Sequence, residues 1–121
     1  MVRRLLEIAE SFDVDVIEVI GHTDEQPVIG RASNFDRSLP SVTQGNGNPG
    51  VLQWADNAGL GLARALAVVR VLSSDLRLQS FQILPLSAAQ LIDINGRLTR
   101  WDNQADVRER RRIEIRMRKS V

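Results

Sequence analysis

The sequence predicts an α/β fold, a two-layer sandwich in which helices cover one face of a small mixed β-sheet. Three segments carry this prediction: a strand at 13–20 that is apolar on both sides, a largely apolar helix at 57–74, and an alternating strand at 112–118. A length of 121 residues and a hydrophobic content of 43% suit one domain, residues 1–121, with a single modest core.

The N-terminal half is expected to hold one helix, one strand and one long loop. Apolar and charged residues separate onto two sides in residues 2–11, which predicts a short helix. The strand at 13–20 has the pattern of a central strand that is covered on at least one face. Gly, Asn, Ser and Pro are frequent in residues 25–56 and predict a long inserted loop. Four residues are expected to pin this loop down: Phe35, Leu39, Leu52 and Trp54.

The segment 57–74 is the strongest helical signal in the chain. Asp56 or Asn57 can cap its start by accepting hydrogen bonds from the first free amides. Apolar residues then recur at helical spacing, which predicts a largely buried helix: Leu62, Leu66, Val69 and Leu72.

The remainder of the chain is expected to add two strands. The first covers residues 80–86, and residues 88–92 predict a helical turn. Asn95-Gly96 predicts a tight turn. In residues 112–118 apolar and charged residues alternate, so three of them should face the core: Ile113, Ile115 and Met117.

Composition excludes several classes of function. The chain has 0 cysteines, which rules out disulfides, thiolate nucleophiles and cysteine-bound metals. Its net charge of +1 argues against a partner selected by bulk electrostatics. The apolar runs fall short of the roughly 18 residues that cross a bilayer. We therefore expect a membrane anchor or an export signal to lie outside this chain.

The polar cluster Gly21-His22-Thr23-Asp24 is the first candidate site, because open α/β sheets place ligands at the carboxyl ends of their strands. A strand-to-loop turn whose Thr and Asp satisfy local amides is the simpler alternative. A metal held by His22, Asp24 and Glu25 is less favoured, because no second ligand cluster is present in the sequence. A single histidine also leaves no catalytic set to assemble, so we expect neither an enzyme nor a cofactor.

Arg64 is the second candidate, since it interrupts a helix that is otherwise apolar from Leu60 to Val69. A buried guanidinium needs a carboxylate or a ligand to satisfy it. A snorkelling arginine with its head in solvent is the alternative. Free amides at the start of the helix would favour an anion nearby.

The basic C-terminal strand raises the question of nucleic-acid binding. Its arginines, however, are interleaved with Glu114 and have no stacking aromatic beside them. A solvated strand face is therefore favoured, and nucleic acid is not the expected partner.

Three segments resemble the motifs of OmpA-like peptidoglycan-binding domains. Residues 17–24 are similar to the family's strand that ends in Gly-His-Thr-Asp. Residues 57–68 match its Asn-x-x-Leu-Ser-x-x-Arg-Ala-x-x-Val, with Gly61 in the position of Ser. Residues 110–115 resemble its closing Asn-Arg-Arg-Val-Glu-Ile, with Arg110 in place of Asn. The three motifs follow one another in the family's order.

This resemblance implies that Asp24 and Arg64 bind the diaminopimelate of a peptidoglycan stem peptide. Asp24 would take the ligand's ammonium group and Arg64 its carboxylate. Motif position implies supporting roles for four further residues: Thr23, Asn57, Leu60 and Arg111. The implied function is non-covalent anchoring of a membrane protein to the bacterial cell wall. The domain would then lie in the periplasm, tethered to the inner or outer membrane by a segment outside this chain.

Two departures keep alternatives open. The segment between Asp24 and Arg64 is much longer than is usual in the family, and the family's strand before the first helix is missing. Flagellar-stator (MotB-like) domains also lengthen this segment, which would imply an inner-membrane channel partner. A MotB-like domain without wall binding would serve as a homodimerisation scaffold. A nucleic-acid module would instead depend on the basic strand: Arg112, Arg116 and Arg118.

Overall fold

The structure, a computed structural model, describes residues 1–102 and 107–121. Its described part contains three α-helices and a three-stranded mixed sheet. The elements follow in the order α1 (Val2–Phe12), β1 (Val16–His22), α2 (Phe35–Thr43), α3 (Asn57–Ser73), β2 (Gln82–Ala89) and β3 (Ile113–Arg118). Three single-turn 3-10 helices lie between them: η1 (Pro49–Val51), η2 (Leu76–Leu78) and η3 (Arg108–Arg110).

β1 is the central strand of the sheet, whose order is β2-β1-β3. It pairs in parallel with β2 and antiparallel with β3. A parallel pair requires a crossover connection, and α3 supplies its main part. The prediction of a central strand that is apolar on both sides is confirmed, with the strand beginning at Val16 and not at Asp13.

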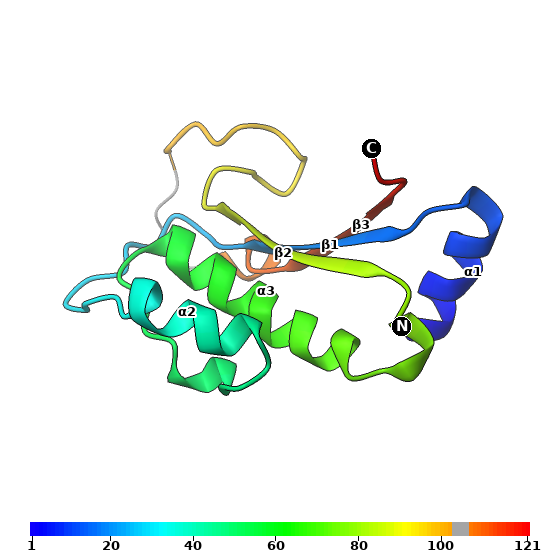
Figure 1. Cartoon of the computed structure of the whole chain (residues 1–121). Coiled ribbons are helices and arrows are strands. Elements are labelled where there is room, and N and C mark those ends of the chain that lie inside the picture. Colours follow the sequence, from blue (N-terminus) through cyan, green and yellow to red (C-terminus); the bar gives the residue numbers. More distant parts are fainter. Residues whose placement is uncertain (103–106) are drawn as a thin grey trace.

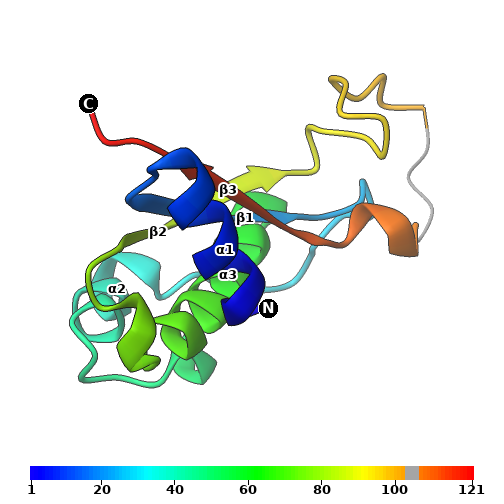
Figure 2. The same ribbon diagram turned by 90° about the vertical axis from the view of Figure 1, so that its right-hand side faces the viewer.

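α3 runs along one face of the sheet, and α1 packs at one end of that same face (Figures 1 and 2). Their apolar side chains meet those of β1 and η2 in a buried cluster: Leu5, Ile17, Val19, Ala65, Leu72 and Leu78. Ile113, Ile115 and Met117 of β3 pack against this cluster, which confirms their predicted inward direction. No helix in the described part of the chain is long and apolar enough to span a membrane.

The segment 25–56 is more ordered than its composition predicts. It contains α2, which lies on the far side of α3 from the sheet (Figure 1), and the turn η1. Val42 and Leu52 form a second buried cluster with Ala63 and Leu66 of α3. All four residues that were expected to pin this segment lie in the cluster or against it. Leu52 is one of its buried members, and three partly buried residues pack against it: Phe35, Leu39 and Trp54.

The prediction that residues 88–92 form a helical turn is wrong. β2 continues to Ala89, which pairs with His22 across an irregularity in the register of β1. The chain then forms a short hairpin in which Ile92 bridges Leu98. Gly96 adopts a φ of 75° at its tip, which confirms the predicted Asn95-Gly96 turn.

Candidate functional site

Four consecutive polar residues at the carboxyl end of β1, His22 to Glu25, are all buried. The backbone amide of Thr23 donates to the carbonyl of Ala89 at 2.9 Å, which extends the pairing with β2. Its hydroxyl donates to the carbonyl of Asp24 at 3.1 Å. Thr23 therefore fixes the turn that aims the two carboxylates that follow it.

The carboxylate of Asp24 accepts hydrogen bonds from three donors. The amide of Gln26 lies 3.1 Å from Oδ1, and the amide of Val107 lies 3.0 Å from Oδ2. The third donor is the Arg111 guanidinium, whose Nη1 is also 3.0 Å from Oδ2. The cation paired with Asp24 is therefore Arg111 and not Arg64.

Glu25 faces a different arginine. Its carboxylate accepts from Arg110 Nη1 at 3.0 Å and also from the Thr99 hydroxyl. This pair was not predicted from the sequence, in which Glu25 is only a weak candidate metal ligand and Arg110 only a departure from the family motif. An arginine in the position of the family's Asn, with an extra carboxylate directly after Asp24, was the available signal.

His22 forms a third separate contact, with Nε2 lying 2.8 Å from Glu114 Oε1 on β3. Two hydrogen bonds hold the pKa of Glu114 below its ordinary value of 4.5. The one from Arg116 has the larger effect, and the one from His22 the smaller. Three neighbouring side chains, His22, Asp24 and Glu25, thus contact three different partners. Within residues 1–102 and 107–121, no group of three or more potential ligands is placed to hold a metal ion.

The start of α3 lies directly beside this turn. The side-chain amide of Asn57, itself buried, donates to the Gln26 carbonyl at 3.1 Å. Asp56 is the N-cap, and its carboxylate accepts from the Gly59 amide at 2.8 Å. Asn57 therefore positions the turn. At the start of α3, the amide of Gly59 is already hydrogen-bonded to the Asp56 carboxylate and so is not free for a ligand.

A close contact between two glycines brings α3 this near to β1. A Cβ atom at Gly21 would lie 1.9 Å from the carbonyl oxygen of Gly61. A Cβ atom at Gly61 would lie 2.5 Å from the Ser87 hydroxyl and 2.8 Å from the Gly21 carbonyl oxygen. Glycine in place of the family's Ser at position 61 is therefore required by this packing.

Arg64 lines a cavity of about 490 Å³ between α3 and the segment before β3. Arg108, Arg111 and Arg112 line the same space, which we call the arginine cavity. The Nη1 atoms of Arg64 and Arg112 are buried, and neither has a hydrogen-bond partner in the described part of the chain. Arg64 is therefore not a buried cation with all its hydrogen bonds made, and it is not a snorkelling arginine with its whole guanidinium in solvent either.

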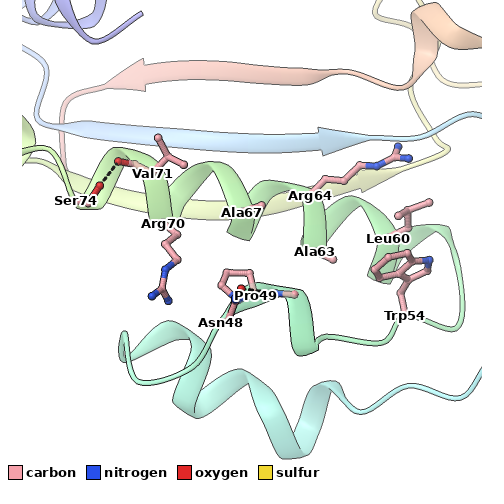
Figure 3. Close-up of a pocket in the computed structure, with 11 residues that line it drawn as sticks. Asn48, Pro49, Trp54, Leu60, Ala63, Arg64, Ala67, Arg70, Val71 and Ser74 are labelled. Carbon is pink, nitrogen blue, oxygen red and sulfur yellow. Dashed lines mark hydrogen bonds between the residues drawn. The ribbon is translucent and has the colours of Figure 1, made fainter.

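The arginine cavity brings the predicted site residues together indirectly. Arg111 contacts Asp24 on one side and shares the cavity with Arg64 on the other. Leu60 lies elsewhere, in a larger groove on the other side of Arg64 (Figure 3). Of the predicted residues, Arg64 and Arg111 thus line the cavity, and Asp24 adjoins it through Arg111 without contacting Arg64 directly. Thr23 and Asn57 belong to the turn beside Asp24 and do not line the cavity.

The arginines of the basic strand have partners of their own. Arg116 pairs with Glu114 at 2.7 Å, and Arg118 lies 3.4 Å from Glu18. Arg112 precedes the strand, and its Nη2 donates to the carbonyl of Asp93 at 3.3 Å. These contacts agree with a strand face on which charges are balanced within the protein.

No protein-family model, curated protein or solved structure matches the chain. The resemblance to OmpA-like domains therefore rests on the three motifs and their order along the sequence.

Proposed function

We propose that this chain is an OmpA-like domain that binds the diaminopimelate of peptidoglycan stem peptides without covalent chemistry. The observation that carries the proposal is that Arg64, whose buried Nη1 has no hydrogen-bond partner among the described residues, lines a cavity with three further arginines. In the described part of the chain no carboxylate lines this cavity, so its chemistry suits an anionic group.

The carboxylate of the ligand would occupy the arginine cavity. A buried donor without a partner costs about 1–3 kcal/mol, and more when it is charged. A carboxylate has two oxygens in the geometry that a guanidinium recognises, so it can satisfy Arg64 in a bidentate contact. Arg112 lines the same cavity, and its buried Nη1, which has no hydrogen-bond partner among the described residues, offers a further donor.

The ammonium of the ligand would bind Asp24. Because the Asp24 side chain is only 6% exposed, the ammonium must replace a donor that is already present. The replaceable donor is Arg111, whose side chain is 30% exposed and lies between Asp24 and the cavity. In this exchange the ligand's ammonium takes the place of Arg111 Nη1 at Asp24 Oδ2. The Arg111 side chain then joins Arg64 at the ligand's carboxylate.

This exchange keeps Asp24 paired with a cation before and after binding. It also limits the gain, since one ion pair is lost for the pairs that form. We therefore expect weak binding at a single site, which the repetitive wall raises through avidity. The biological role we propose is anchoring in the periplasm, with the membrane tether lying outside this chain.

Co-sedimentation with purified sacculi of the diaminopimelate type tests the proposal. The wild type should pellet, whereas Asp24→Ala and Arg64→Ala should stay in the supernatant. Arg3→Ala is the matched control, because Arg3 is highly exposed on α1 and far from the cavity. Soluble diaminopimelate should compete with the sacculi for the wild type.

Equal pelleting of the wild type and the two site variants would show that the proposed site is wrong, and so would the absence of any pelleting. Circular dichroism of each variant separates loss of binding from loss of fold. Binding to nucleic acid that falls steeply with salt and depends on Arg116 and Arg118 would favour the basic-strand function instead.

A further inference from the structure

A second, larger cavity of about 630 Å³ lies beside the arginine cavity. One wall is a stripe of α3 at helical spacing: Leu60, Ala63, Ala67 and Val71. The facing wall is formed by η1 and Trp54, from the segment between the first two motifs (Figure 3). We call this space the α3–η1 groove.

The groove adjoins the arginine cavity, since Arg64 and Ala67 line both. In Figure 3 the guanidinium of Arg64 points toward the strands, away from the η1 wall, whereas Arg70 points toward α2. Ala67 is small and exposed and lies one helical turn after Arg64. A ligand held by Arg64 can therefore extend over Ala67 into the groove.

The walls of the groove are held in place by the protein itself. Arg70 Nη1 donates to the Gly47 carbonyl at 2.6 Å, which ties the segment before η1 to α3. The guanidinium of Arg31 lies 4.3 Å from the centre of the Trp54 ring, a cation–π contact that orients this side chain. Leu52, which follows η1, is buried against α3. The groove is thus a preformed feature of the α3–η1 contact.

The lining selects for a particular kind of ligand. The α3 side chains are small or aliphatic, so they suit methyl groups better than bulky or charged side chains. The charged lining residues are Arg64 and Arg70, and the described chain places no carboxylate on the walls. This combination complements a peptide that carries negative charge and small apolar side chains.

We infer that the α3–η1 groove is a second subsite, which holds the alanine residues of the stem peptide that contains the bound diaminopimelate. This inference rests on the proposed function and extends it. It gives the long segment between the first two motifs a role: the segment forms the outer wall of the peptide site.

Isothermal titration with two soluble ligands tests the inference. Free diaminopimelate reports on the arginine cavity alone, and a purified stem peptide with terminal D-alanine reports on both subsites. The wild type should bind the peptide about tenfold more tightly than free diaminopimelate, as expected from burying one or two methyl groups.

Two variants should remove this gain without affecting free diaminopimelate. Val71→Trp fills the groove, and Val71→Glu places a negative charge in it, where it repels the peptide. Val71 is exposed on α3 and lines the groove but not the arginine cavity. Ala58→Phe is the matched control, because Ala58 is also exposed on α3 but lines neither cavity. It should leave both affinities unchanged.

Equal affinity of the wild type for the two ligands would overturn the second subsite and leave the proposed function intact. A peptide affinity that both groove variants retain would do the same. Loss of both ligands in a folded Val71→Trp protein would show one undivided site and so overturn the inference. If the wild type binds neither ligand, or Arg64→Ala binds both normally, the proposed function fails and the second subsite fails with it.

Discussion

Arg110 and Glu25 form an ion pair in the interior of the protein, with Arg110 Nη1 lying 3.0 Å from Glu25 Oε1. Their side chains are 6% and 0% exposed. Arg110 Nη2 also donates to the Gln90 carbonyl at 2.6 Å, and the Thr99 hydroxyl donates to Glu25. The pair therefore ties together the segments that follow β1, follow β2 and precede β3.

Removing one partner of this pair should destabilise the fold strongly. Arg110→Asn, which introduces the residue of the OmpA-like motif, removes the guanidinium from the buried Glu25 carboxylate. Breaking a buried pair in this way costs about 3–5 kcal/mol. Urea unfolding measures the loss, and the double variant Glu25→Leu/Arg110→Met should lose less than the single one. A single variant as stable as the wild type would show that Glu25 does not need Arg110.

The contact between Gly21 and Gly61 leads to a second prediction. Gly61→Ser restores the family's residue but places Cβ within 2.8 Å of a backbone oxygen. We expect a loss of about 1–3 kcal/mol in the free energy of unfolding, as for other overpacked sites. Gly59→Ala is the control, because its Cβ would come no closer than 3.2 Å to a neighbouring atom. Equal stability of the two variants would contradict the packing argument.

The regular elements could be predicted where burial of one or more faces produces a periodic pattern of apolar residues in the sequence. β3 alternates because one face of it meets the core, and α3 is apolar because it lies between the sheet and α2. α2 could not be found this way, since it is short, contains Pro40 and lies among Gly and Asn residues. Its stability comes from tertiary packing of Val42, which local composition does not report.

The proximity of the main candidate site residues was predictable from the sequence, but their contacts were not. Motif position placed Asp24, Arg64 and Arg111 in one region, and the structure does so as well. The pairing of Asp24 with Arg111 depends on side chains 87 positions apart along the chain. Such a partner is selected by the fold, because several arginines near the end of the chain were equivalent candidates in the sequence.

The contacts of Glu114 with Arg116 and His22 predict a dependence of stability on pH. The pKa of Glu114 is lowered in the folded protein, mainly by the hydrogen bond from Arg116. A carboxyl group of this kind stabilises the fold when ionised, so its contribution is complete above its ordinary pKa of 4.5. The contribution is lost as the pH falls through the lowered folded value.

Glu114→Gln should therefore be less stable than the wild type at neutral pH, and the difference should shrink as the solution is acidified. Urea unfolding from about pH 7 down to about pH 3 measures this difference. Glu109→Gln, at an exposed position in η3, is the control. A difference in stability that stays constant over the whole range would show that the charge of Glu114 is not responsible.

The role of Arg64 predicts selectivity between wall types. Stem peptides with lysine in place of diaminopimelate lack the carboxylate that Arg64 is proposed to bind. The wild type should prefer the diaminopimelate peptide roughly ten- to hundredfold, the value of one charged hydrogen-bonded contact. Arg64→Gln should abolish most of this preference, because it mainly weakens the peptide that carries the carboxylate. Titration of both peptides into both proteins gives the coupling between Arg64 and that carboxylate. If Arg64→Gln weakens the two peptides by the same factor, Arg64 supports the fold of the site and does not contact the carboxylate of the ligand.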